Sequence, residues 1–244
     1  LAAVVLSKKE FSLMYSAVIF DLDGTLLNTL TDLANAGNHT LEVLGFPTHP
    51  VDAYRYLVGN GIPKLIERML PEKNRGPATQ QTALSIFLRY YEAHKQDTTA
   101  PYPGILPMLQ ALKGAGLRLG VVSNKENSLS QEVAAHYFPG LFDAVAGHVL
   151  GTPTKPDPAL LNGLMAQFGV QAGQVLYVGD SNVDIQTAQN AHVESCGVLW
   201  GFRTEEELRA EGASYLVHTP RQLADLALGQ AEPPRLSDAQ GVVG

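Results

Sequence analysis

Short apolar runs, each followed by a polar loop and then by an amphipathic segment, recur along most of the chain. Apolar runs bounded by polar turns are typical of buried strands, and a spacing of three to four residues between apolar positions is typical of helices. The pattern predicts strands at 17–20, 117–122, 175–178, 198–200 and 215–217. It predicts core helices at 105–113, 129–136, 158–168, 184–191, 204–211 and 220–228. Because strands that alternate with helices form right-handed crossovers, we expect an α/β fold with a doubly wound parallel sheet.

The interval from 28 to 101 breaks this alternation. Its apolar spacing is helical at 30–44, 62–70 and 84–91, and no run of comparable strength predicts a strand there. We therefore predict an all-helical domain, 28–101, inserted into a core domain made of 14–27 and 102–228. Residues 1–13 are predicted to be an N-terminal extension. Residues 229–244, rich in Gly, Pro and polar side chains, are predicted to be a disordered tail.

Composition and charge narrow the class of partner. Hydrophobic residues make up 45% of the chain, which suits a protein with a sizeable core, and the net charge is -7. Since no cluster of Lys and Arg offsets this charge, we expect neither a nucleic acid nor a membrane as partner. The single cysteine, Cys196, excludes an internal disulfide, and no apolar stretch is long enough to span a bilayer. A cytoplasmic protein, monomeric or homodimeric, is the expectation.

The clearest chemical signal is Asp21, Asp23 and Gly24, directly after the first predicted strand. In an open parallel sheet, ligands bind outside the carboxyl ends of the strands, so carboxylates at this point lie where chemistry is usually done. Taken alone, an Asp-x-Asp-Gly segment is equally compatible with a simple turn.

Three further segments fall where the same sheet edge would need them. Ser123 and Asn124 follow the second core strand, Lys155 precedes a predicted helix, and Asp180 and Asp184 follow the third core strand. Each alone would be read as a turn, a helix cap or a surface charge. Their occurrence together and in this order favours a functional site.

The four segments resemble, in order and spacing, the four motifs of the haloacid dehalogenase superfamily. Residues 28–101 resemble its helical cap, and the resemblance covers roughly 14–228. Within the superfamily, the segments 58–61 and 198–204 look most like those of phosphoglycolate phosphatases. Two positions depart from the family pattern: Asn28, where many relatives carry Asp, and His192, where relatives often carry Gly. We interpret the first as a helix N-cap and the second as a change at a helix end.

The resemblance implies a phosphatase mechanism. Asp21 would be the nucleophile that forms an aspartyl phosphate, and Asp23 would protonate the leaving oxygen and then deprotonate the attacking water. Lys155 would take part in catalysis by holding the transferred phosphoryl group. The other residues implied to bind phosphate or substrate are Thr25, Ser123, Asn124, Gly59, Asn60 and Gly61. The implied cofactor is Mg²⁺, held by Asp21, by the backbone carbonyl of Asp23, by Asp180, and by Asp184 either directly or through water.

The substrate is predicted from the loop Gly59-Asn60-Gly61, since a glycine-rich loop before a helix exposes N–H groups that suit a compact anion. A small phosphorylated metabolite, most specifically 2-phosphoglycolate, is the expected partner. Asp23 argues against a dehalogenase, which has no leaving oxygen to protonate. An inorganic pyrophosphatase, a sugar-phosphate phosphatase and an enzyme like β-phosphoglucomutase stay open, although the Ser-Arg pair that the last needs is absent from this loop. From a different class, a non-catalytic protein that binds phosphorylated metabolites also stays open.

Overall fold

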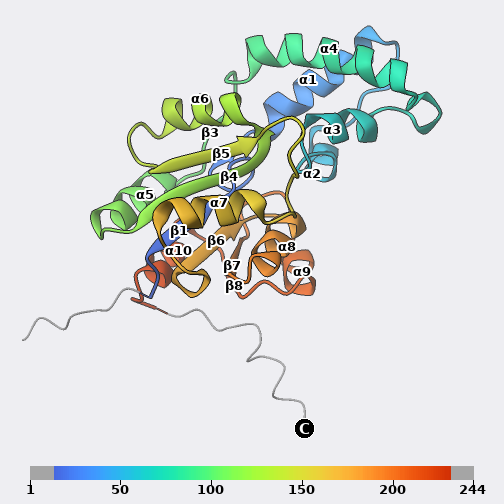
Figure 1. Ribbon diagram of the computed structural model, residues 1–244. Helices are drawn as coiled ribbons and strands as arrows, with labels where there is room; N and C mark the ends of the chain where they lie inside the picture. Colours follow the sequence, from blue (N-terminus) through green and yellow to red (C-terminus); the bar gives the residue numbers. More distant parts are fainter. Residues whose placement is uncertain (1–13, 232–244) are drawn as a thin grey trace, which may run out of the picture.

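The computed structural model of the protein describes residues 14–231. The predicted extension, 1–13, and residues 232–244 of the predicted tail lie outside this range. Figure 1 shows a sheet covered by helices and, at one edge of it, a separate group of helices. Within residues 14–231, no helix combines the length and the apolar character that crossing a bilayer requires.

A six-stranded parallel sheet forms the centre of the protein, which confirms the predicted fold class. The strand order is β5-β4-β1-β6-β7-β8. The strands are β1 (Ala17–Phe20), β4 (Arg118–Glu126), β5 (Ala144–His148), β6 (Val175–Gly179), β7 (Glu194–Val198) and β8 (Tyr215–Val217). Because β1 pairs in parallel with both β4 and β6, the loop after β1 emerges at the middle of the sheet edge.

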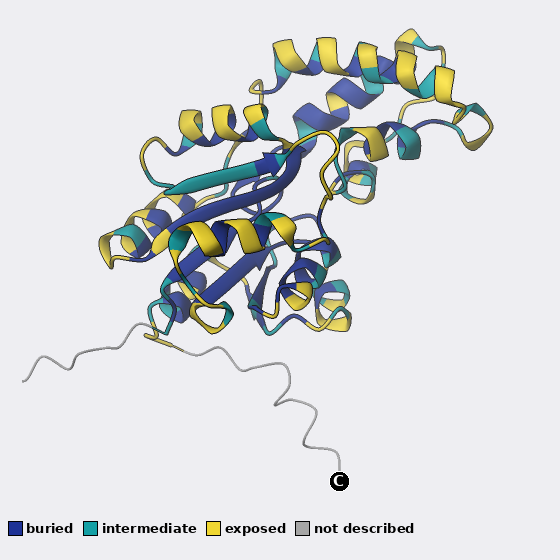
Figure 2. Ribbon diagram, in the orientation of Figure 1, coloured by how far each residue is buried: buried dark blue, intermediate teal, exposed yellow. Residues whose placement is uncertain are grey.

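Helices cover both faces of the sheet. On one face lie α5 (Ile105–Gly114), α6 (Asn127–Tyr137) and α10 (Pro220–Ala227). On the other lie α7 (Ala159–Phe168) and α8 (Asn182–Asn190), with α9 (Glu205–Ala210) packed beside α8. Alternate residues of β1 point to opposite faces, Val18 and Phe20 to the first and Ala17 and Ile19 to the second. A strand buried on both sides therefore needs the continuous apolar run seen in the sequence. Figure 2 shows the central strands β4 and β6 buried and the edge strand β5 partly exposed.

The helical insertion leaves and rejoins the sheet at one place. Strand β2 (Leu27–Asn28) pairs antiparallel with β3 (Ala100–Pro101). Between them lie α1 (Leu30–Val43), α2 (Tyr54–Leu57), α3 (Ile62–Met69) and α4 (Pro77–His94), with short 3-10 turns at Val51–Ala53 and Glu72–Asn74. Side chains from all four helices form a hydrophobic cluster separate from the clusters of the sheet. Figure 1 shows these helices grouped beyond the edge of the sheet.

Several elements differ from the sequence prediction. Strand β5 was not predicted, because it is a half-buried edge strand that contains Gly147 and whose apolar side chains, apart from Val145, are alanines. Strand β7 lies earlier in the chain than predicted, and α4 begins at Pro77, where the sequence suggested a break. Strand β4 continues through Glu126, with a register shift between Val122 and Glu126, so Ser123 and Asn124 lie inside this irregular stretch and do not follow the strand.

Candidate active site

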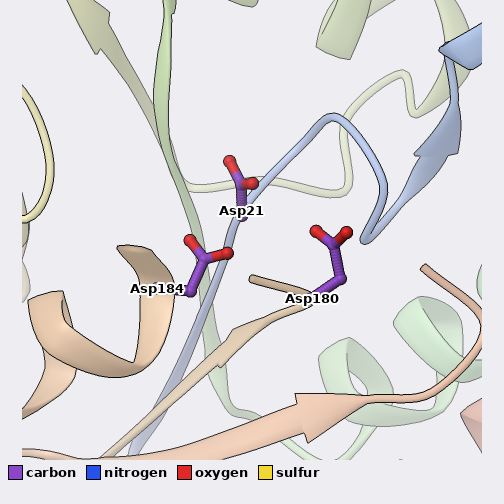
Figure 3. A group of neighbouring side chains, drawn as sticks. All are labelled: Asp21, Asp180 and Asp184. Atoms are coloured by element: carbon purple, nitrogen blue, oxygen red, sulfur yellow. The ribbon is translucent and has the colours of Figure 1, made fainter. Parts of the chain in front are cut away.

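Three carboxylates converge at the carboxyl ends of neighbouring strands. Asp21 follows β1, Asp180 follows β6, and Asp184 lies in the first turn of α8. One carboxylate oxygen from each lies within 4.8 Å of the others, and all three residues are buried. Figure 3 shows the three side chains directed toward one volume. An all-oxygen donor set of this kind fits a hard divalent cation.

Lys155 supplies the positive charge nearest to these carboxylates. Its Nζ atom lies 2.8 Å from Asp21 Oδ1 and 2.7 Å from Asp184 Oδ1, and its side chain is buried. Burial lowers the pKa of Lys155, but the carboxylates of Asp184 and Asp21 outweigh it and raise that pKa well above its ordinary value. Lys155 is therefore a fixed cation, and it lies against the residue predicted to be the nucleophile.

Burial and neighbouring carboxylates raise the pKa of Asp21 and of Asp180. Burial raises the pKa of Asp21 to about 8; Lys155 opposes this, while Asp184 and Asp180 add to it. Burial and Asp184 raise the pKa of Asp180 to about 7, against the hydrogen bonds from Phe202 N and Thr25. A carboxyl group is forced to keep its proton when its ionised form is neither hydrated nor neutralised. The site without a cation thus carries more negative charge than its surroundings stabilise.

Neighbouring groups fix the position of Asp180. Its Oδ1 accepts a hydrogen bond from Thr25 Oγ1 at 3.0 Å, and its Oδ2 accepts one from Phe202 N at 2.7 Å. Trp200 Nε1 donates to the carbonyl of Thr25 at 2.9 Å, so the segment after β7 holds both Asp180 and the loop after β1. The hydroxyl of Thr25, predicted to bind phosphate, is thus engaged with a carboxylate.

Asp184 is held from both sides. Its Oδ2 accepts from Ser181 N at 3.1 Å and from Ser181 Oγ at 2.6 Å, in a capping box at the start of α8. Its Oδ1 accepts from Lys155, and Tyr177 Oη lies 3.4 Å away. Both carboxylate oxygens therefore already have donors from the protein.

Asn124 joins three parts of the chain. Its Oδ1 accepts from Lys155 N at 2.7 Å, while its Nδ2 donates to Lys155 O at 3.2 Å and to Gly59 O at 3.1 Å. The side chain of Asn124 thus fixes the backbone of Lys155 and connects it to the helical insertion. Gly59 and Gly61 both have positive φ, at 107° and 81°, which favours glycine at these positions.

A small cavity of about 50 Å³ lies between the sheet edge and the insertion. Its polar lining includes Asp21, Asp23 and Ser123, and the loop residues Gly59 and Gly61 also line it. Its apolar wall comes from the insertion and consists of Leu33, Val58, Ile62 and Leu65. Asn60, predicted with its two glycine neighbours, is not among the described residues that line the cavity.

Asp23 lines the same cavity as Asp21, and its carboxylate faces Lys125. Lys125 Nζ lies 3.1 Å from Asp23 Oδ1, 3.0 Å from Asp23 Oδ2 and 3.1 Å from Tyr91 Oη of helix α4. Neither Lys125 nor Tyr91 was predicted from the sequence to belong to the site. The position of Lys125, directly after Ser123 and Asn124, was the available signal, but nothing in the sequence joins it to Tyr91.

The fold and the site together can be compared with known proteins. The family model described as haloacid dehalogenase-like hydrolase matches residues 18–198, which include the three carboxylates, Lys155 and the insertion. The chain belongs to the haloacid dehalogenase-like hydrolases. The resemblance found in the sequence is thereby confirmed.

Curated relatives within this hydrolase family include two phosphoglycolate phosphatases. The one from Colwellia psychrerythraea is 34% identical over 212 residues, which cover 84% of this chain and 94% of the relative. The one from Pseudomonas putida is 33% identical over 232 residues, covering 91% of this chain and 84% of the relative. The similarity therefore extends through the core and the insertion alike.

Solved structures of haloacid dehalogenase-like proteins have the same architecture. A crystal structure from Lactobacillus delbrueckii subsp. bulgaricus, whose assignment as a phosphoglycolate phosphatase is provisional, aligns with a TM-score of 0.85. It is 33% identical to this chain and covers 89% of it, and all of the Lactobacillus chain is covered. The arrangement of sheet and insertion is thus shared with an experimental structure.

Proposed function

We propose that this haloacid dehalogenase-like hydrolase is a Mg²⁺-dependent phosphatase that hydrolyses 2-phosphoglycolate through an aspartyl-phosphate intermediate. The observation that carries the proposal is the convergence of Asp21, Asp180 and Asp184 with Lys155, next to a small cavity that Asp21 lines. The names of the curated relatives support the substrate.

In this proposal Asp21 attacks phosphorus, the bond from phosphorus to the ester oxygen breaks, and the carboxyl proton of Asp23 passes to that oxygen. A water molecule then attacks phosphorus, loses a proton to Asp23, and the acyl-phosphate bond breaks to restore Asp21. Lys155 and Ser123 stabilise the charge on the phosphoryl oxygens. Asn124 keeps Lys155 in place through the two hydrogen bonds to its backbone.

The residues that would hold Mg²⁺ are Asp21, Asp180 and the backbone carbonyl of Asp23. Because Asp184 Oδ1 contacts the Lys155 ammonium and Asp184 Oδ2 accepts two hydrogen bonds from Ser181, we propose that Asp184 acts through a water molecule. Bound there, the cation would neutralise charge on the carboxylates and on the phosphoryl oxygens. We assign Thr25 to the positioning of Asp180, since its hydroxyl donates to that carboxylate.

The helical insertion acts as a cap that selects the substrate. The cavity is small, and apolar side chains of the insertion form part of its wall, which favours a compact substituent on the phosphoryl group over a hexose. Its apolar wall repels bulk water, and the Gly59-Asn60-Gly61 loop brings backbone groups close to the cavity. These features support a short carboxylate ester over a sugar phosphate or pyrophosphate.

The first experiment measures phosphate release from 2-phosphoglycolate with and without Mg²⁺. Asp21→Asn should lower kcat by at least about a thousandfold, because an amide is nearly isosteric with the carboxylate and cannot attack phosphorus. Asp52→Asn, on an exposed side chain of the insertion, is the matched control and should retain full activity. An Asp21→Asn enzyme within tenfold of wild type would exclude the aspartyl phosphate.

A second experiment tests the substrate by comparing kcat/KM for 2-phosphoglycolate, a hexose phosphate, pyrophosphate and p-nitrophenyl phosphate. Gly61→Ala places a side chain at φ 81° and 3.3 Å from Asn124 O, so the loop must shift. We expect the preference for 2-phosphoglycolate to fall at least about tenfold, while p-nitrophenyl phosphate hydrolysis changes less. A wild-type preference for pyrophosphate would contradict the substrate and leave the phosphatase class intact.

A further inference from the structure

The contact between Lys125, Asp23 and Tyr91 lies outside the roles assigned above. Lys125 comes from β4 of the core, Asp23 from the loop after β1, and Tyr91 from α4 of the insertion. The ammonium group contacts both carboxylate oxygens of Asp23 and the hydroxyl of Tyr91 at 3.0 to 3.1 Å. One side chain thus joins the proposed acid/base to the cap.

The contact is built into the interior. The side chain of Lys125 is 4% exposed and that of Asp23 is 20% exposed. Tyr91 is buried, and its ring stacks on Phe87 within the hydrophobic cluster of the insertion. The Lys125 ammonium lies 5.4 Å from the centroid of the Tyr91 ring, on the side of the ring that carries the hydroxyl. The ion pair between Lys125 and Asp23 is therefore buried, and its ammonium group makes several hydrogen bonds, unlike that of a surface ion pair.

The geometry gives Asp23 a restraint that its own loop does not supply. Within residues 14–231, the ammonium of Lys125 is the side-chain donor that reaches the Asp23 carboxylate. A carboxylate on two rotatable bonds and partly exposed would otherwise exchange rotamers and turn toward solvent. Proton transfer needs the carboxyl oxygen within hydrogen-bond reach of the reacting oxygen.

We propose that Lys125 is a positioning residue that holds Asp23 in its working orientation only while Tyr91 of the cap is in place. This inference rests on the proposed function, in which Asp23 transfers a proton to the leaving oxygen and later takes one from water. When the cap lifts, Lys125 loses the Tyr91 hydroxyl, its ammonium is free to turn toward solvent, and the orientation of Asp23 is no longer fixed. Proton transfer is thereby confined to the closed enzyme, from which bulk water is excluded.

The test compares two leaving groups, because p-nitrophenolate departs without a proton whereas the alkoxide of 2-phosphoglycolate requires one. With 2-phosphoglycolate, Lys125→Met should lower kcat at least about a hundredfold, with KM changed less than about threefold. With p-nitrophenyl phosphate, the same variant should release a burst of p-nitrophenolate equal to the enzyme concentration. Slow turnover should follow the burst, since hydrolysis of the intermediate still needs Asp23 as a base.

Tyr91→Phe isolates the link to the cap, because it removes one hydroxyl and keeps the buried ring. It should lower kcat for 2-phosphoglycolate about three- to tenfold, and the double variant should be no slower than Lys125→Met alone. Effects that multiply would overturn the coupling. If Lys125→Met does not melt cooperatively, a Tyr91→Phe enzyme with wild-type kcat for 2-phosphoglycolate and no burst with p-nitrophenyl phosphate would overturn the proposal by itself.

Two matched controls separate positioning from general packing. Lys95→Met removes another buried ammonium between insertion and core, one that pairs with Glu92 and Glu132. Tyr90→Phe removes a neighbouring hydroxyl whose ring stacks on His39 and His94. Neither should produce a burst or change the ratio of the two activities.

Equal losses on both substrates without a burst in Lys125→Met would overturn the role of Lys125 and leave the phosphatase standing. A wild-type enzyme inactive on both esters with Mg²⁺ would instead overturn the proposed function, and this inference with it.

Discussion

At the scale of single residues, the carboxylates of the site pack against glycines. A Cβ atom on Gly201 would lie 2.2 Å from Asp180 Cβ, and one on Gly24 would lie 2.4 Å from Asp180 Oδ2. On Gly179 it would lie 2.2 Å from Asp184 Cβ. Distances this short require movement of the carboxylate or of the backbone, so these glycines leave the space that Asp180 and Asp184 occupy.

Gly201→Ala should therefore displace Asp180 and weaken cation binding. We expect the apparent Kd for Mg²⁺ to rise at least about tenfold, the equivalent of 1.4 kcal/mol. Titration of Mg²⁺ followed by activity or calorimetry measures this change. Gly163→Ala is the control: it lies on exposed α7 with no neighbouring atom within 4 Å and should stabilise the protein by roughly 0.5–1 kcal/mol. Equal Mg²⁺ affinity in Gly201→Ala and wild type would contradict the assigned site.

His192 shows what a single residue in a sequence can and cannot reveal. His192 adopts φ 57° directly after Ala191, the C-cap residue of α8. This is the position where a left-handed conformation ends a helix. The sequence analysis expected a change at a helix end here. Local rules sufficed for that inference, because a helix terminus depends on neighbours in sequence.

At the scale of elements, one carboxylate joins the two chain segments that connect the insertion to the core, which together form its hinge. Asp32, in the first turn of α1, is 1% exposed and accepts hydrogen bonds from both the N–H and the hydroxyl of Thr98 and of Thr99. These two threonines precede β3, so Asp32 ties the outgoing chain of the insertion to the returning chain. Helix α1 therefore cannot tilt without breaking these bonds.

Asp32→Asn should destabilise the folded protein by roughly 1–3 kcal/mol, because an amide replaces some acceptors with donors and removes charge-assisted hydrogen bonds. Urea denaturation at fixed Mg²⁺ measures the difference. Asp97→Asn, whose carboxylate pairs with His94 on the exposed surface nearby, should change the free energy of unfolding by less than about 0.5 kcal/mol. Similar losses in the two variants would mean that the hinge bonds add no stability.

Strands and helices could be predicted where the burial of that one element sets its pattern of apolar residues. The buried runs of β1 and β6 and the apolar face of α5 follow from the sequence alone. Strand β5 did not, because its half-buried side chains are small and its pairing with β4 is a non-local contact. The start of α4 was missed because Gly76-Pro77 resembles a turn and is also a suitable beginning for a helix.

The candidate site shows the same division. The edge of a parallel sheet brings Asp21, Asp180 and Asp184 together whatever the loops do, so their proximity could be argued from strand order. The contact of Lys125 with Tyr91 depends on how the insertion packs on the core, and no spacing in the sequence encodes it. The roles of all these residues stay predictions until the variants are measured.

At the scale of the whole molecule, the site couples stability to pH and cation. Asp21 and Asp180, with pKa values raised by burial to about 8 and about 7, keep protons in the folded state that they lose in the unfolded chain above about pH 4. Above about pH 4, the folded state therefore binds more protons than the unfolded chain. The stability that Asp21 and Asp180 contribute is fully present below about pH 4 and falls as the pH rises toward 7 and 8. Without a cation, these two groups make the protein less stable at pH 8 than at pH 5.

Mg²⁺ should reverse this trend, because it binds the ionised carboxylates of the folded state. A cation at a hundredfold excess over Kd stabilises by about 2.7 kcal/mol. The increase in Tm on adding Mg²⁺ should therefore be larger at pH 8 than at pH 5.5, and Asp180→Asn should reduce it. Thermal melts at both pH values, with and without chelator, measure this effect. A pH-independent shift, unchanged in Asp180→Asn, would place the cation elsewhere.

The pairing of β2 with β3 makes the chain path of the insertion independent of the sheet to which it is attached. The two ends of the insertion meet as neighbouring strands, with Leu27 opposite Pro101 and Asn28 opposite Ala100. The chain therefore passes between the insertion and the core only through a two-stranded ribbon, and the distance between the two ends of the insertion is fixed. Helices between these ends can lengthen, shorten or be replaced without altering the register of the six-stranded sheet. Under the proposed function, changes in the insertion can therefore alter which substrate is selected without moving Asp21, Asp180 and Asp184 at the edge of the sheet.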